Sequence, residues 1–448
     1  MTTYAEALDY IYDLTKYGIK LGLKNISYLL FLLGDPHKKL KIIHVGGTNG
    51  KGSTSSLISS ILQSDGYKVG LYTSPHLVDF TERIEINQKQ IKRERVGKLL
   101  EKIKPYIEKV AHTPSYGHPT FFEVITSMAF LYFFEEQVDF LVLEVGLGGR
   151  LDATNVCEPL ISVITHIDYD HMDKLGNSLK EIAREKGGII KPGGILITSK
   201  QYDEAYNEIK KIADEKNSLI YSIGGEISYE IVKSDIKGVI FGLKGISHNY
   251  KNLHTPLLGR HQAENAATAI TAIEALKIKG LNISEKAIRG GLEKVKWVGR
   301  LEIIQNNPTL ILDGGHNPNG VKMMQQSLEE IFSYHRLILV LAIFADKDYK
   351  KMIQILAPTA DLIITTKAKN PRATPPQIIA KEAEQYINQN KIIVTENIPQ
   401  AIRCALSNSK EDDLICITGS LYVVGEAKRY FKNKIKLKTE SAKRKTII

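Results

Sequence analysis

The chain has 448 residues, of which 43% are apolar and 25% are charged; this is the composition of an ordinary soluble globular protein, and the length predicts two domains rather than one. Its apolar runs fall short of the roughly 20 residues that a membrane helix needs, and Asp9 and Asp13 do not fit a signal peptide, so we expect a cytoplasmic protein without a membrane partner. The formal charge of +10 does not by itself indicate nucleic-acid binding, because residues 431–448 hold six Lys, one Arg and one Glu and are typical of a short solvated tail.

Residues 4–33 are predicted to be helical with a break at Tyr17-Gly18, and a strand over 40–45 then runs into the loop Gly46-Gly47-Thr48-Asn49-Gly50-Lys51-Gly52-Ser53. A helix is expected over 54–63, so backbone N–H groups and a helix dipole point at one place, which suits a polyphosphate. Lys51 would neutralise phosphate charge and Ser53 could hold Mg²⁺. A strict P-loop has Gly at position 45 and Ser or Thr at position 52, where this chain has Val45 and Gly52. The alternative is an ordinary glycine turn, but the flanking strand and helix favour a nucleotide site.

Two more strands are predicted to end at the edge of the sheet that carries this loop. A strand over 68–72 completes a βαβ unit and predicts a parallel sheet, and Ser74 after it is a candidate metal ligand. A strand over 139–145 ends on Glu144, for which we weigh a Mg²⁺ ligand against a strand-end salt bridge. Between them we expect a surface or mobile loop over 82–95 and helices over 96–110 and 121–134.

The next strand, over 160–164, leads to His171, which by itself would be an ordinary loop histidine. Lys186 closes a helix and is predicted to point into the same edge, where the two residues could bridge phosphates and metal. A strand over 194–199 and an antiparallel appendage over 219–250 follow. A helix then opens within 258–265 and runs to about 276, and Asn265 in its first turns is either a cap or a ligand residue.

Residues 296–300 are predicted to join two halves, because the alternation of strands and helices starts afresh beyond them. Strands over 309–313, 337–342, 362–366, 391–395 and 413–418 indicate a second, doubly wound domain. Its first strand ends in Asp313-Gly314-Gly315-His316-Asn317-Pro318, a further candidate site. The predicted domains are an ATP-binding domain over 1–295, a linker over 296–300, a C-terminal domain over 301–430 and a basic tail over 431–448.

Six motifs occur in one order along the chain: residues 47–53, 73–76, 144–155, 170–171, 185–188 and 313–318. Together they resemble those of the folylpolyglutamate synthase/dihydrofolate synthase family of the Mur ligase superfamily, over about residues 18–425. Two departures replace a common Ala with Gly, in Lys186-Gly187-Gly188 and in Asp313-Gly314-Gly315-His316, and leave the polar groups in place. The resemblance implies an α/β fold, with a P-loop-containing parallel-sheet ATPase domain followed by a smaller Rossmann-like domain.

The resemblance also implies an ATP-dependent amide ligase. A folate carboxylate attacks the γ-phosphate to give an acyl phosphate, and the amino group of L-glutamate then displaces phosphate. The acceptor is a folate, 7,8-dihydropteroate or both, and the protein is expected to be a monomer that binds small molecules and no nucleic acid. The rival hypotheses are another Mur-type amino-acid ligase, a P-loop NTPase with a nucleic-acid-binding tail, and a nucleotide-binding module without catalysis.

Site residues carry over from the family by motif. The expected catalytic residues are Lys51, His171, Lys186 and His316, and the expected ATP contacts are Asn49, Gly50, Lys51, Gly52, Ser53, Asn265, Arg300 and Asp313. Two Mg²⁺ ions are expected near Ser53, Ser74, Glu144, His171 and Lys186, with Lys186 similar to the carbamylated lysine of the family. Asp152 resembles a residue near the pterin, and Phe122 is a candidate to stack on it.

Overall fold

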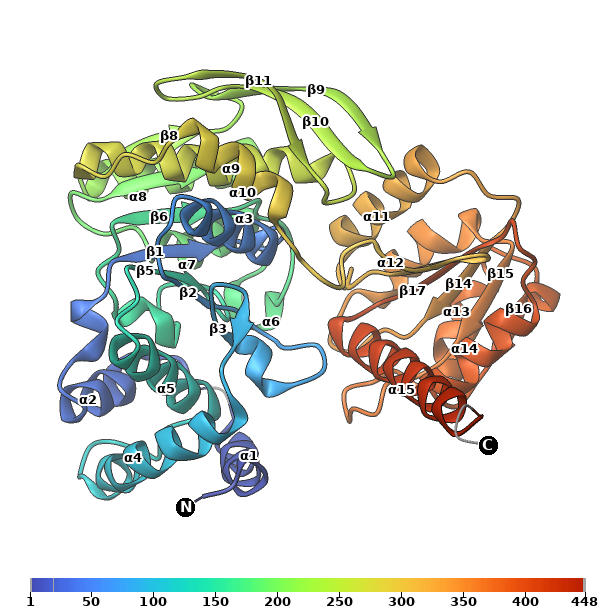
Figure 1. The fold of residues 1–448 in the computed structure, drawn as a ribbon, viewed down its shortest axis with the longest axis horizontal. Helices are drawn as coiled ribbons and strands as arrows, with labels where there is room; N and C mark the ends of the chain where they lie inside the picture. Colours follow the sequence, from blue (N-terminus) through green and yellow to red (C-terminus); the bar gives the residue numbers. More distant parts are fainter. Residues whose placement is uncertain (1, 19, 446–448) are drawn as a thin grey trace.

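The computed structural model describes residues 2–18 and 20–445, and only the backbone of residues 435–445. Two sheets, each with its own helices, form two halves of the molecule (Figure 1). The halves are joined by the segment between α10 (Glu285–Lys294) and β12 (Glu302–Asn306). The last three residues of the predicted basic tail, 446–448, lie outside the described residues.

The main sheet of the first half consists of β1 (Ile42–Gly46), β2 (Val69–Tyr72), β3 (Ile84–Ile86), β4 (Lys89–Gln90), β5 (Phe140–Glu144), β6 (Ile161–Ile164), β7 (Ile195–Thr198) and β8 (Leu219–Ser222). Their order is β4-β3-β2-β5-β1-β6-β7-β8. β1 lies in the middle, parallel to β5 and β6. Every residue of β1 is buried because helices cover both faces of the sheet. The carboxyl ends of β1, β2, β5 and β6 therefore meet at one edge.

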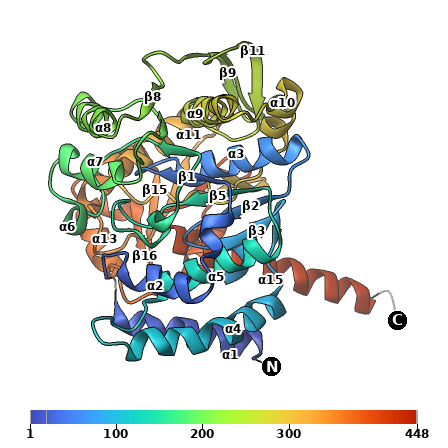
Figure 2. The ribbon, with the colours of Figure 1, turned by 90° about the vertical axis from the view of Figure 1, so that its left-hand side faces the viewer.

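Helices pack on both faces of this sheet (Figures 1 and 2). One face carries α3 (Lys51–Ser64), α9 (His261–Ala275) and α10; the other carries α1 (Tyr4–Asp13), α2 (Lys24–Leu32), α4 (Arg93–His112), α5 (Phe121–Glu135), α7 (Leu179–Gly187) and α8 (Asp203–Glu215). α5 is buried from Glu123 to Phe133, as expected of a helix that is apolar nearly all round. A single turn, α6 (Met172–Leu175), follows the loop after β6.

A small antiparallel sheet of β9 (Ser228–Asp235), β10 (Gly238–Lys244) and β11 (Asn249–Thr255) packs over α9 and α10 through Phe241 and Leu253. The sequence correctly predicted an antiparallel appendage, but the predicted start at residue 219 was too early. Residues of β8 pair in parallel with β7 and belong to the main sheet.

The second half is built on β12, β13 (Thr309–Leu312), β14 (Leu337–Leu341), β15 (Leu362–Thr365), β16 (Ile392–Val394) and β17 (Leu414–Thr418), in the order β12-β13-β17-β14-β15-β16. All these strands are parallel except β12, a half-buried edge strand that the sequence pattern did not predict. α11 (Pro318–Ile331), α12 (Tyr349–Leu356) and α13 (Pro376–Ala383) cover one face, and α14 (Ile398–Ser407) and α15 (Leu421–Lys445) the other. Figure 2 shows the end of α15 extending away from the body.

The architecture agrees with the predicted fold class, and two local predictions need correction. The segment 82–95 is not a loop: it forms β3 and β4, and it is held by the buried side chains of Ile84, in β3, and Ile91, directly after β4. The predicted tail begins inside a packed helix, because Phe431 is only 9% exposed and lies in the core of the second half. None of the helices in the described ranges is long and apolar enough to cross a bilayer.

Candidate active site

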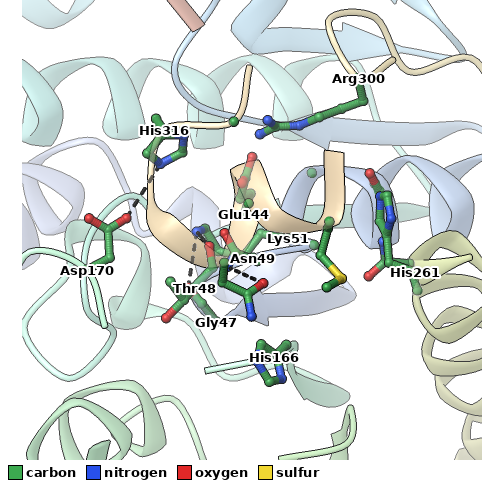
Figure 3. A pocket seen from close by; sticks show the side chains of 18 of the residues that line it. Gly47, Thr48, Asn49, Lys51, Glu144, His166, Asp170, His261, Arg300 and His316 are labelled. Atoms are coloured by element: carbon green, nitrogen blue, oxygen red, sulfur yellow. Dashed lines mark hydrogen bonds and ion pairs between the residues drawn. The ribbon is translucent and has the colours of Figure 1, made fainter. Parts of the chain in front are cut away.

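A pocket of about 450 Å³ lies where the two halves meet (Figure 3). The first half contributes the loop after β1 and the ends of β2, β5 and β6; the second contributes the joint and the loop after β13. The predicted site residues that line this pocket are Asn49, Gly50, Lys51, Gly52, Ser53, Ser74, Glu144, His171, Lys186, Asn265, Arg300, Asp313 and His316. Phe122 and Asp152 are absent from its lining.

The loop between β1 and α3 presents a helix N-terminus to the pocket. The N–H groups of Thr48 and Asn49 donate to the carbonyl of His166, at 2.9 and 3.1 Å, and fix the loop against the exit of β6. Gly50 is the N-cap of α3 at φ +92°, a conformation that favours glycine. The first N–H groups of α3 have no partner within the helix and are free to bind an anion.

The departure from a strict P-loop at Gly52 has a steric reason. A Cβ at this position would lie 2.2 Å from the ring of Trp297, which packs over the first turn of α3. Trp297 belongs to the segment that joins the halves, and it lines the pocket itself. Glycine is therefore required at position 52 for the joint to pack on the nucleotide loop.

Two lysines, the half-buried Lys51 and the buried Lys186, converge on one carbonyl group. The Nζ atoms of Lys51 and Lys186 donate to the Gly47 carbonyl at 3.1 and 2.8 Å. Burial lowers the pKa of both, and for Lys186 burial together with the neighbouring Lys51 charge lowers the pKa to about 7. Two cations held this close indicate a site for a multiply charged anion.

The residues predicted to bind metal fit Mg²⁺. Glu144 is 4% exposed at the end of β5, and its Oε2 accepts the N–H of Ser74 at 3.1 Å. Burial raises the pKa of Glu144 and the charge of Lys51 opposes that shift. Within the described chain, no three His, Cys, Asp or Glu side chains gather as a complete metal site. One carboxylate with nearby hydroxyls is the usual protein share at a Mg²⁺ site, where water and phosphate oxygens supply the remaining ligands.

His171 lies in a cluster that joins the halves. Its Nε2 is 3.2 Å from Nζ of Lys347, so this nitrogen accepts and the other carries the proton. Burial lowers the pKa of His171 to about 4, so the imidazole is neutral at pH 7, the form that can bind a metal. Lys347 also pairs with Asp170 at 2.5 Å. Sequence reasoning missed Lys347, which follows β14 in a charged turn without any strand-end glycine.

The loop after β13 is shaped by Asp313. Its carboxylate accepts the N–H groups of Leu301 at 2.9 Å and Gly315 at 2.7 Å. His316 donates from Nδ1 to the Gly314 carbonyl at 3.0 Å, which leaves Nε2 facing the first half. Asp313 thus lines the pocket. Both of its carboxylate oxygens also hold the backbone around His316 in place.

The start of α9 forms another wall. Asn265 donates to Gln262 at 2.9 Å, and its Oδ1 lies so close to Gly50 that a Cβ there would be at 2.4 Å. Gln262 and the neighbouring His261 also line the pocket, and the prediction missed both, although they lie in the segment that opens the predicted helix. Burial lowers the pKa of His261 to about 4.

Phe122 and Asp152 lie together behind the glycine turn after β5. A Cβ on Gly146 would be 2.4 Å from the Phe122 ring, and Asp152 accepts N–H groups of Leu147 and Thr154 at 2.8 and 3.0 Å. Both residues therefore support this turn, and their predicted roles toward a pterin stay predictions.

Comparison with known proteins gives the family. The Mur ligase middle domain matches residues 45–273, and the glutamate ligase domain of Mur ligases matches residues 299–421. A dihydrofolate synthase/folylpolyglutamate synthase of Bacillus subtilis is 38% identical over 433 residues, which cover 96% of this chain and all of that protein. The chain belongs to the folylpolyglutamate synthase/dihydrofolate synthase family. The resemblance stated from the sequence motifs is confirmed.

Solved structures of this family have the same fold. Folylpolyglutamate synthase of Mycobacterium tuberculosis, complexed with ADP, matches at a TM-score of 0.89 and 31% identity, over 96% of this chain and 99% of that one. FolC of Escherichia coli, in complex with DHPP and ADP, matches at 0.87 and 30% identity, over 97% and 98%. The predicted fold class, a P-loop sheet domain followed by a smaller Rossmann-like domain, is confirmed.

In this member of the synthase family, Gly52→Ser is expected to weaken ATP binding although it restores the residue of a strict P-loop. The added side chain would collide with Trp297, and overpacking of about 1–3 kcal/mol corresponds to a loss of affinity of roughly 5- to 150-fold. Isothermal titration calorimetry with ATP measures the change. Ser64→Ala at the far end of α3 is the control, and an affinity equal to or above that of the wild type in Gly52→Ser would contradict the steric argument.

Proposed function

We propose that this chain is an ATP-dependent ligase that joins L-glutamate to a folate through an amide bond. One observation carries the proposal: in a member of this family, a helix start suited to phosphate, two converging lysines and a buried carboxylate line one pocket, and the second half closes it. ATP is the co-substrate. The reaction brings together several anions, so neutralisation of charge and positioning must supply most of the catalysis.

The proposed reaction has two steps. A carboxylate oxygen of the folate attacks the γ-phosphorus of ATP, the bond to the bridging oxygen breaks, and ADP leaves with that electron pair. The amine of glutamate then attacks the acyl phosphate, phosphate leaves, and the amine loses a proton. Lys51 and the start of α3 hold the phosphates during the first step. His316 and Arg300 face the same pocket from the second half, which excludes water that would hydrolyse the acyl phosphate.

Magnesium is proposed to accompany ATP in this pocket, with two ions in all. Ser53, Ser74 and Glu144 would hold the first, and His171 with Lys186 the second. Bound Mg²⁺ supplies positive charge next to the phosphate oxygens. The neutral state of His171 agrees with this role.

Lys186 is proposed to be carbamylated. Only a neutral amine reacts with CO₂, and a pKa of about 7 leaves much of Lys186 neutral near physiological pH. The product carries a carboxylate, so a buried cation becomes an anion able to meet Mg²⁺. The same burial would be costly for an unmodified ammonium group without an acidic partner.

The acceptor is proposed to be a folate, 7,8-dihydropteroate or both, bound on the side of the pocket near Phe122 and Asp152. We propose a monomer in the cytoplasm, a reducing compartment that suits the three free cysteines.

The proposal is tested with ATP, Mg²⁺ and labelled glutamate, offered separately with tetrahydrofolate and with dihydropteroate, and with the products analysed by mass spectrometry. We expect an acid longer by one glutamate and one ADP for each bond. ATP consumption without a longer pteridine acid would refute the proposal. Ligation to a UDP-linked acid instead would identify another Mur-type ligase.

Removal of residues 432–448 is expected to leave kcat/KM within about twofold of the wild type, because α15 is anchored by buried residues up to Phe431, and among its described residues it is Leu421, before the cut, that lines the pocket. Steady-state ligation measures the effect. The cut follows Phe431 so that the core of the second half stays intact, and a shorter deletion of 440–448 is the control. A large loss of activity, or stimulation of the full-length ATPase by RNA, would favour the nucleic-acid alternative.

A further inference from the structure

Asp170 is a carboxylate of the first half whose side-chain partners come largely from the second half. Its Oδ2 lies 3.5 Å from Nε2 of His316 (Figure 3). The same oxygen lies 3.4 Å from Nδ2 of Asn317, and Oδ1 lies 2.5 Å from Nζ of Lys347. Within its own half, Asp170 accepts the N–H of His171 at 2.9 Å and lies 3.8 Å from the ring of that residue.

This contact between the halves is buried. The side chains of Asp170 and Lys347 are 9% and 8% exposed. A buried charge is stable only with partners, and removal of one partner leaves the other uncompensated. Separation of the halves would take Lys347, His316 and Asn317 away from Asp170 at once. The carboxylate therefore favours the closed arrangement.

A second contact leads from the same place to the phosphate loop. Asn317 caps α11 by accepting the N–H of Gly320 at 2.8 Å, and its Nδ2 donates to Oδ1 of Asn49 at 3.0 Å. Asn49 was predicted to contact ATP, and here its side chain also reaches the other half. The start of α11 is thus held by the phosphate loop on one side and by Asp170 on the other.

We propose that Asp170 is a positioning residue that holds the second half closed over the phosphate loop and so places His316 in the pocket and Lys347 beside His171. The proposal rests on the proposed ligase function, because closure matters where an acyl phosphate must be shielded from water. It goes beyond that function in assigning closure to one carboxylate, which needs no contact with ATP or the folate to act.

Its neighbour Asp168 serves as a contrast. The carboxylate of Asp168 accepts the N–H of Tyr169 at 2.7 Å and lies 3.7 Å from His166, both in the first half. Asn319 of the second half also hydrogen-bonds to Asp168, but this partner is neutral. Two acidic residues of one loop thus face different partners. Asp170 is the one that pairs with a lysine of the other half.

The test compares Asp170→Asn, Lys347→Met and the double variant with the wild type. Asp173→Asn and Lys350→Met are matched controls, since both residues are exposed and lie three positions after Asp170 and Lys347 in the sequence. Small-angle X-ray scattering with a non-hydrolysable ATP analogue gives the radius of gyration. Ligation assays give kcat and KM for each substrate, and thermal unfolding shows whether each variant is folded.

We expect both single variants to have a larger radius of gyration and a kcat lower by roughly tenfold or more, with the folate KM nearly unchanged. The double variant should be no worse than the more damaged single one, because both changes break the same contact. Lower kcat without a change in scattering would overturn the proposal, since Asp170 would then act on substrate or metal directly. The proposal would also be overturned if the losses of kcat in Asp170→Asn and Lys347→Met were additive in the double variant. If the wild type ligates no folate, the proposed function fails, and the scattering data still decide whether Asp170 holds the halves together.

Discussion

Lys51→Ala is expected to lower kcat/KM by roughly 10³-fold, about the effect of removing one preorganised group from the site of developing charge. The Nζ of Lys51 lies at the start of α3, where the phosphates are proposed to bind, and it is held there by the carbonyls of Gly47 and Thr48. ATP turnover and ligation, measured together, check the result.

Lys98→Ala is the control for this change, because Lys98 is an exposed lysine on α4. The melting temperature of Lys51→Ala should stay near that of the wild type, since Lys51 is half-buried and its hydrogen bonds go to two backbone carbonyls, an arrangement that contributes only modestly to stability. Ligation at a rate close to that of the wild type would mean that the phosphates bind elsewhere.

Lys186→Ala is expected to lower kcat by about 10²-fold or more, and short carboxylates such as formate or acetate should restore part of the activity. Alanine leaves a space where the proposed carbamate would lie, and a small carboxylate can enter it. Mass spectrometry of the wild type under CO₂, with trapping of the carbamate, gives a readout independent of activity.

The pH dependence follows from the pKa of Lys186, about 7. Below that pH the ammonium form dominates and cannot react with CO₂, so trapped carbamate should decrease as the pH falls through 7 and increase above it. Lys180→Ala, an exposed lysine near the start of α7, is the control. If Lys186→Ala keeps full activity, or if added carboxylates do not raise the activity of this variant, Lys186 has only a structural role.

Local signals predicted much of the fold and most of the pocket. The apolar runs before the glycine loop and before Glu144 identified central strands. Because parallel strands end at one edge, Ser74 and Glu144 could be placed together from their positions in the sequence alone, and Lys186 was predicted to point to the same edge from the end of a helix. The sequence did not predict the edge strand β4 or its neighbour β3, because both strands are short and their segment is rich in charge.

The contacts between the halves could not be predicted in the same way. Asp170 and Lys347 are separated by 177 positions in the chain, and their pairing depends on how two independent sheets face each other. Lys347 stands in a turn whose composition is that of an ordinary solvated surface. The steric need for Gly52 likewise arises from Trp297, which only the folded chain brings to α3.

Trp297 is the single tryptophan of the chain. Its indole rests on the first turn of α3, where we propose that the phosphates bind, and it belongs to the segment that connects the halves. The intrinsic fluorescence of this protein, when excited selectively at tryptophan, therefore comes from one place. Stopped-flow emission can follow nucleotide arrival in the unlabelled native enzyme, without a dye or an engineered reporter.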